Sequence, residues 1–114
     1  MASASDTGLN VDRRTALSNT DVAVKASGGR VYGFHFFNPN TTDAYVQFYN
    51  ALIADVVVGT TTPDITFWVP ASSALDHSYN PPLSFGVAIT IAATTTASGG
   101  TAPSSGLLTN VFYL

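Results

Sequence analysis

Residues 28–51, GGRVYGFHFFNPNTTDAYVQFYNA, decide the fold because they read as two β-strands joined by a tight polar turn. Residues 31–37 and 44–49 are rich in aromatic and β-branched side chains, which suit a pleated, half-buried surface. Residues 38–43 between them are all turn formers. Because side chains alternate between the faces of a strand, one face of this pair is apolar and the other carries aromatic residues with polar tips. The second face indicates a surface that something other than the protein's own core covers.

The composition favours strand over helix and one domain over two. The 114 residues suffice for a single hydrophobic core. Only 10% of them are charged, far below the usual share of about 25%. The chain has no Glu and a single lysine, Lys25, but it is rich in Thr, Val and Gly, which suits strands. We therefore expect an all-β domain whose solubility rests on Thr, Ser and Asn or on burial in an assembly.

Charge and cysteine content exclude several classes of protein. Four basic residues in a chain of net charge −3 cannot build an extensive phosphate-binding surface, so no nucleic-acid partner is expected. The chain has no cysteine, which excludes disulfides and thiolate metal sites. No apolar run approaches the length of a membrane span, so no membrane partner is expected. Residues 1–10 lack the pattern of a secretory signal, which predicts synthesis and folding in the cytoplasm.

The first twenty residues differ from the rest because they show no sustained periodicity. We interpret residues 1–20 as an irregular N-terminal arm and residues 21–114 as the folded domain. A short helix from Asp12 to Leu17 is an alternative within the arm, since an Asp can cap a helix. The arginines at positions 13 and 14 form either a solvated pair or a contact with an acidic neighbour.

The rest of the chain reads as short strands separated by Gly- and Pro-containing turns. We expect strands over 21–26, 30–38, 44–50, 55–58, 65–69, 85–92 and 107–114. Such spacing without a convincing helix predicts a single antiparallel β-sandwich of the jelly-roll type, or a partly closed barrel. The predicted core is Val22, Val24, Phe34, Phe36, Val46, Phe48, Ile65, Phe67, Val87, Ile89, Ile91 and Val111. Residues 71–84 and 94–106 are expected to be long irregular loops, which are often functional.

Residues with chemical potential are present but poorly arranged. Residues 76–78, DHS, contain the side-chain types of a catalytic triad, but neighbours in a chain cannot converge as a triad must. His35 and His77 would share a metal ion only by coincidence of the fold. Asp55 and Asp64 flank a turn and are best explained as turn formers. We therefore predict no catalytic residue, no metal site and no cofactor.

Four aromatic residues allow two interpretations, an oligomer interface or a platform on which sugars stack. They are Tyr45, Tyr49, Trp68 and Tyr79. The interface is favoured for Tyr45 and Tyr49, which lie within a strand, because aromatic residues are enriched in interface cores. Tyr79 lies in an expected loop, where a ligand contact is the alternative.

Five short elements occur in the same order as in a family of small phage structural proteins. They are Gly28/Gly29-x-Val31-Tyr32, Asn38-Pro39-Asn40, Tyr45-Val46-Gln47-Phe48-Tyr49, Gly59-Thr60-Thr61-Thr62-Pro63 and Ala92-x-Thr94-Thr95-Thr96. Through them most of residues 22–114 resembles the capsid cement, or decoration, proteins of tailed phages, including cyanophages. The resemblance implies a trimeric β-sandwich on the outer surface of the virion head, and similar modules occur at the distal ends of tailspikes.

The resemblance implies a homotrimer that binds the major capsid protein and braces the shell against the pressure of the packaged DNA. For the trimer contact we predict the residues of the polar-tipped face, namely His35, Phe37, Tyr45 and Tyr49. For the capsid contact we predict Arg13 and Arg14 of the arm. The alternative is a tip module that binds a receptor or a host-surface glycan through loops 71–84 and 94–106. An enzyme is the third possibility, for which the sequence offers no catalytic constellation.

Overall fold

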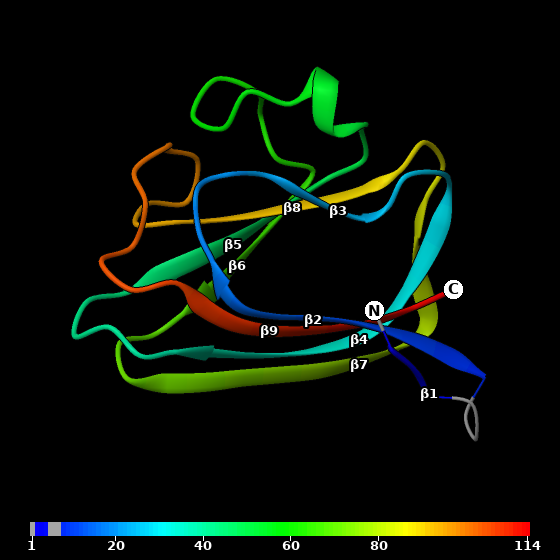
Figure 1. The fold of residues 1–114 in the computed structure, drawn as a ribbon, viewed down its shortest axis with the longest axis horizontal. Helices are drawn as coiled ribbons and strands as arrows, with labels where there is room; N and C mark the ends of the chain where they lie inside the picture. The colour runs from blue at the N-terminus through cyan, green and yellow to red at the C-terminus, as the bar shows by residue number, and fades with distance from the viewer. Residues whose placement is uncertain (1, 5–7) are drawn as a thin grey trace.

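The chain folds into two antiparallel sheets packed face to face, as a computed structural model shows for residues 2–4 and 8–114 (Figure 1). The strand order is β1-β2-β9-β4-β7 in the five-stranded sheet and β3-β8-β5-β6 in the four-stranded sheet. In chain order the elements are β1 (Ala2–Ala4), β2 (Leu9–Leu17), β3 (Val22–Lys25), β4 (Gly29–Asn38), β5 (Ala44–Tyr49), the 3-10 helix η1 (Ile53–Asp55), β6 (Ile65–Val69), β7 (Ser73–Phe85), β8 (Ile89–Thr94) and β9 (Leu107–Tyr113).

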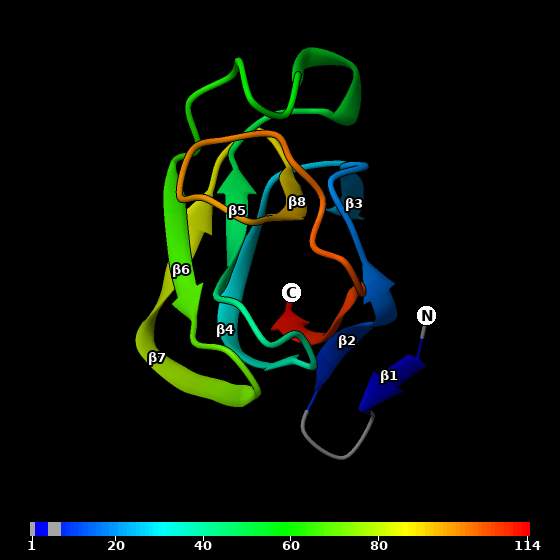
Figure 2. The ribbon, with the colours of Figure 1, turned by 90° about the vertical axis from the view of Figure 1, so that its left-hand side faces the viewer.

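The connections between strands follow the jelly-roll pattern. From β2 to β9 each connection crosses from one sheet to the other, except the β5–β6 connection, which stays within the four-stranded sheet (Figure 2). The strands β2, β9, β4 and β7 thus face β3, β8, β5 and β6, and β1 extends the first sheet beyond β2. Two Greek keys folded in this way make a jelly roll. The predicted antiparallel sandwich of jelly-roll type is confirmed.

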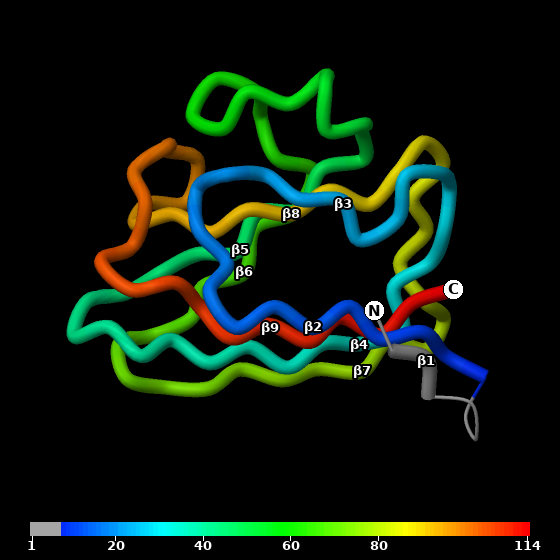
Figure 3. The backbone as a smooth tube through the Cα atoms, in the orientation of Figure 1, coloured from blue at the N-terminus to red at the C-terminus, as the bar shows by residue number. Residues whose placement is uncertain are grey.

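The C-terminal strand lies in the middle of the five-stranded sheet, between β2 and β4 (Figure 3). Its ladder with β4 extends to the last residue, since Arg30 and Leu114 exchange backbone hydrogen bonds of 2.9 and 3.0 Å. Alternate residues of β9 are buried, beginning at Leu107 and ending at Tyr113. The strand expected at 107–114 is confirmed, and its position explains why the end of the chain is so apolar.

The core between the sheets is built around phenylalanines. The rings of Phe34 and Phe36 lie 4.3 Å apart, and Phe48 meets Phe67 edge-on at 5.4 Å. All but one of the predicted core residues are buried or packed against the buried cluster. Val87 is the exception, at 51% exposed. It is exposed because the chain turns from β7 into β8 there, and the single strand expected over 85–92 does not form.

The prediction of an irregular arm over residues 1–20 is wrong for the residues that the structure describes. Leu9–Leu17 forms strand β2, which pairs with β9 within the five-stranded sheet. The alternative of a helix over these residues is wrong as well. Strand periodicity was hidden because Asp12 and Arg14 occupy positions on the inner face, where apolar residues are expected. A register shift after Arg14 further obscures the alternation. Residues 1 and 5–7 lie outside the described part of the chain.

The prediction of a loop over residues 71–84 is also wrong. Most of this segment forms β7, the edge strand beside β4. Its polar residues and its two prolines suit an edge strand, whose outer side needs no hydrogen-bond partners. Between Gly33 and Val31 the register shifts, so that residues 79–82 bulge out of the ladder. The loop expected over 94–106 is confirmed from Thr95 onward.

The strand expected over 55–58 does not form. Residues 50–64 instead make an excursion that contains η1 and lies over the outer face of the four-stranded sheet (Figure 1). Val56 packs there with Tyr49 and Ala92 in a second, smaller cluster. The short apolar run therefore serves packing on top of a sheet rather than pairing within one.

Candidate functional site

The two outer faces of the sandwich differ in how they are covered. Residues 50–64 lie over the four-stranded sheet, and residues 95–106 close over its buried Gln47. No described segment crosses the outer face of the five-stranded sheet (Figures 1 and 2). We call this uncovered surface of β2, β9, β4 and β7 the open face. It is the candidate functional site, because it is a wide sheet surface that none of the described segments covers.

The strand registers arrange the open face in three rows, because residues directly opposite each other in a ladder point to the same side. One row is Val11, Phe112, Gly33 and Ser78; the middle row is Arg13, Asn110, His35 and Asp76; and the third is Leu108, Phe37 and Ala74. The middle row is polar throughout and carries a cation at the β2 end and a carboxylate at the β7 end. The open face is therefore a polar stripe flanked by apolar side chains, among which Phe37 is 38% exposed.

A hollow of about 480 Å³ lies on the open face, among residues of β4, β7 and β9. It is lined by Phe34, His35, Asp76, His77, Ser78 and Phe112. A Cβ atom on Gly33 would come within 2.7 Å of the His77 carbonyl oxygen, so glycine is what lets β7 approach β4 this closely. The hollow lies beside this close approach of the two strands and is bordered by Phe112.

The structure separates the four residues that were predicted to form one trimer contact. His35 and Phe37 lie on the open face. Tyr45 lies on the other side of the molecule, on the outer face of the four-stranded sheet, opposite Trp68 in the β5–β6 ladder. A flat contact cannot include both sides of one sandwich, so these residues do not form a single patch.

Tyr49 is wrong as a contact residue because it is only 1% exposed within its own chain. Its ring packs with Val56 and Ala92, and its hydroxyl donates a hydrogen bond to the Gln47 Oε1 atom. The alternation along β5 correctly places Tyr45 and Tyr49 on the same face. It contains no information about the excursion of residues 50–64, which covers one tyrosine and leaves the other accessible.

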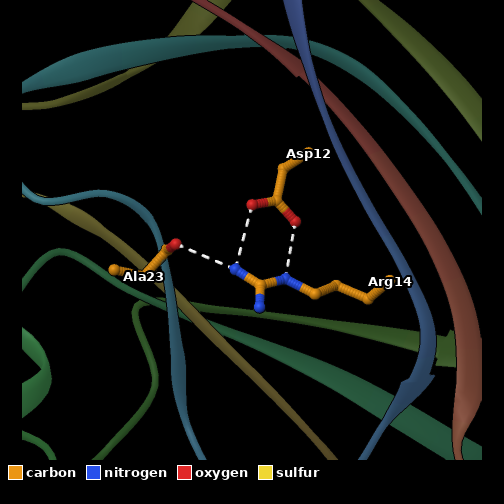
Figure 4. Close-up of polar contacts among 3 residues, drawn as sticks. All are labelled: Asp12, Arg14 and Ala23. Carbon is orange, nitrogen blue, oxygen red and sulfur yellow. Dashed lines mark hydrogen bonds and ion pairs between the residues drawn. The ribbon is translucent and has the colours of Figure 1, made fainter. Parts of the chain in front are cut away.

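The two predicted capsid contacts also differ from each other. Arg13 is exposed at the β2 end of the polar row. Arg14 points to the inner side of β2, where its Nε and Nη2 atoms lie 2.9 and 3.1 Å from the two carboxylate oxygens of Asp12 (Figure 4). Its Nη2 atom also donates to the Ala23 carbonyl oxygen at 3.1 Å. Arg14 therefore ties β2 to β3 along the edge of the sandwich, and a role in capsid contact is not supported for it.

The residue types of a catalytic triad at 76–78 do not converge. Asp76 and Ser78 face outward on β7, whereas His77 lies opposite Phe34 in the ladder and meets the Tyr79 ring edge-on at 4.4 Å. Among the described residues, no three histidine and acidic side chains gather into a group that could hold a metal ion. Within the same described part of the chain, no helix is long and apolar enough to cross a membrane.

Buried amides hold the loops at the end of the sandwich where residues 95–106 lie. Asn40 forms two hydrogen bonds with the Ser105 backbone. Its Nδ2 atom donates to the Ser105 carbonyl oxygen at 2.8 Å, and its Oδ1 atom accepts from the Ser105 amide at 2.7 Å. Asn38 donates to the carbonyl oxygens of Thr42 and Val69 at 3.0 and 3.1 Å. The predicted loop 94–106 is thus fixed to the rigid sheets at several points. Sequence reasoning assigned these asparagines only to turn formation.

The folded structure raises the pKa of three tyrosines, which makes the stability of the fold depend on pH. Burial raises the pKa of Tyr49, with a further contribution from the Asp21 charge, and burial alone raises the pKa of Tyr79. The pKa of Tyr113 is raised by burial and by Asp12, against a lowering by Arg14. A group whose pKa is higher in the folded state holds its proton more tightly there, so its stabilisation is complete below the unfolded pKa of about 10 and is lost as the pH rises further.

We therefore expect the free energy of unfolding to decline steadily above about pH 10. The measurement is urea denaturation at a series of pH values, together with tyrosinate absorbance in the folded and unfolded chain. In the folded chain part of that absorbance should develop at higher pH than in the unfolded chain. Stability that stays constant while all tyrosines titrate normally would contradict the burial described above.

The comparisons with known proteins do not add a family to this description. No family model matches the chain, and neither a curated protein nor a solved structure matches it.

Proposed function

We propose that this chain is a structural protein of a phage virion, a cement protein that binds the assembled head as a homotrimer. One observation carries the proposal: large apolar side chains stay exposed although the core is filled. Val57 is 60% exposed and Trp68 is 56% exposed. Exposed apolar surface of this kind is typical of interfaces between proteins. The jelly roll, which occurs in viral capsid domains, and the sequence elements shared with cement proteins give further support.

The trimer contact is proposed for the side of the four-stranded sheet. A three-fold ring joins two unlike patches, one from each neighbour. One patch on this side is Trp68 on β6 with Tyr45 opposite it on β5. The other patch is a cap, which we define as the exposed residues Leu52, Ile53 and Val57. We propose that Trp68 of one copy packs against the cap of the next. The open face, with His35 and Phe37, then remains accessible.

The proposed mechanism is stabilisation by binding. A partner that binds the assembled shell but not its separate subunits stabilises the shell by RT ln(1 + [L]/Kd). The stabilisation grows with the occupancy of the shell, and it needs no catalytic group and no cofactor. A small, rigid β-domain with fixed loops is suited to such a role, because little conformational entropy is lost when it binds.

Virions of the phage that encodes the chain provide the direct test. A cement protein should be present in a copy number comparable to that of the major capsid protein, as measured by quantitative mass spectrometry of purified particles. Particles that lack it should release their DNA at a lower temperature than complete particles, and added purified protein should restore the difference. Absence from virions, or unchanged DNA release after its removal, would contradict the proposal.

A receptor- or glycan-binding tip module is the second candidate, and Trp68 favours it. An indole exposed on a sheet surface, with Tyr45 opposite it in the ladder, offers aromatic faces of the type on which sugars stack. A tip module would be present in only a few copies per particle. It should bind specific sugars on a glycan array, and Trp68→Ala should abolish that binding. An array that stays blank would count against this candidate.

A further inference from the structure

We propose that the open faces of two copies pack against each other about a two-fold axis parallel to the strands. The proposal starts from the charges of the polar row. Arg13 lies at the β2 end and Asp76 at the β7 end, and both are exposed. Three strand spacings separate them, which is about 14 Å. Between them lie Asn110 and His35, so the row runs from a cation through two half-buried polar groups to an anion.

Two sheets packed face to face keep their strands roughly aligned, which leaves two orientations for a two-fold axis in the plane of the contact. An axis parallel to the strands reverses the order of each row, so that Arg13 of each copy lies over Asp76 of the other. An axis perpendicular to the strands preserves the order and places Arg13 over Arg13 and Asp76 over Asp76. Like charges in contact are strongly unfavourable, so the charge pattern selects the parallel axis.

The apolar rows fit this arrangement. Reversal of the order within a row brings Phe112 of one copy over Gly33 of the other, next to Ser78 and Phe112, which line the hollow of that copy. In the third row it brings Leu108 over Phe37. The perpendicular axis would also place an aromatic ring, that of Phe37, over Gly33, so the apolar residues agree with both orientations. The choice of axis therefore rests on Arg13 and Asp76 alone.

A second copy of this chain is favoured over an unrelated partner because the face is complementary to itself. A single two-fold rotation pairs Arg13 with Asp76 of the other copy and also brings Phe112 over Gly33, beside the hollow. No partner other than a second copy of the chain is needed. The contact is independent of the proposed trimer, which uses the side of Trp68 and the cap. Together, a two-fold and a three-fold contact would join trimers to one another, so that even-numbered assemblies result.

Charge reversal tests the pairing. Arg13→Asp and Asp76→Arg each create two like-charge contacts per dimer, and each should raise the dissociation constant of the two-fold contact by about tenfold or more. The double variant exchanges the two charges and should return the constant to within about threefold of wild type. Asp76→Arg also brings the net charge of −3 closer to zero. If only general repulsion between copies mattered, this variant would associate more tightly than wild type, which is the opposite of the expected result. Sedimentation equilibrium over a range of concentrations measures the constants.

Two further variants separate this contact from the proposed trimer. Phe112→Ala removes the side chain that lies over Gly33 of the other copy and should weaken the two-fold contact. Trp68→Ala, on the opposite side of the sandwich, should leave it unchanged while it weakens the trimer. The inference is overturned if the single charge reversals do not alter association, if the double variant is as weak as they are, or if the wild type forms trimers alone. A wild type that forms the charge-dependent dimer but no trimer would instead contradict the proposed function.

Discussion

Replacement of Phe36 by alanine should lower the free energy of unfolding by about 3–5 kcal/mol. Phe36 is fully buried between the sheets, stacked on Phe34, with Phe48 at a ring distance of 6.2 Å. The substitution removes apolar contacts on several sides and leaves a cavity that the rigid sheets cannot close. A domain of this size has a total stability of about 5–15 kcal/mol, so the variant should be close to unfolding, as measured by urea denaturation.

The neighbouring phenylalanine provides a matched control. Phe37 lies on the same strand but points to the open face, so Phe37→Ala should cost less than about 1 kcal/mol in the monomer. The contrast depends on the alternation of side chains along β4, since a slip of one residue would exchange the two faces. Equal losses for the two variants, or a larger loss for Phe37→Ala, would contradict the assigned register.

Replacement of Gln47 by leucine should also destabilise the fold, by about 1–3 kcal/mol for each buried polar group left unpaired. The Gln47 Nε2 atom lies 2.9 Å from the Thr94 Oγ1 atom and 3.1 Å from the Gly99 carbonyl oxygen. Its Oε1 atom accepts the hydrogen bond of the buried Tyr49 hydroxyl. Leucine fills a similar volume but satisfies none of these groups. We expect lower stability and faster amide exchange in residues 95–106.

Tyr49→Phe allows the contribution of one hydrogen bond to be isolated. In the double variant with Gln47→Leu the unpaired hydroxyl is absent, so the double variant should lose less stability than the sum of the two single variants. Thermal or urea denaturation of the four proteins gives this coupling free energy. Strict additivity would show that the Gln47–Tyr49 hydrogen bond does not stabilise the folded chain.

The strands whose faces differ in polarity could be predicted from the sequence. The alternation in residues 31–37 and 44–49 predicted β4 and β5, and the apolar character of residues 107–114 predicted β9. The spacing of these and the other short strands predicted the sandwich. The prediction failed at β2 because its inner face carries the Asp12–Arg14 ion pair in place of apolar residues. It failed at β7 because an edge strand tolerates prolines and polar residues that are typical of loops.

The candidate site was only partly predictable. Periodicity identified His35 and Phe37 as outward-facing, and both lie on the open face. It could not show that Tyr49 is covered, because that depends on the path of residues 50–64. Nor could it reveal the polar row, whose members lie almost a hundred positions apart in the chain and meet only through the ladder registers.

The mass of the wild-type protein in solution, measured by sedimentation equilibrium from low to high concentration, tests the central claim most directly. The claim is that the open face is a surface through which copies of this chain associate. It predicts that the 11.9-kDa subunit forms dimers, or hexamers where the three-fold contact also forms, in a concentration-dependent manner. A single species of 11.9 kDa at all concentrations, or trimers alone, would contradict it.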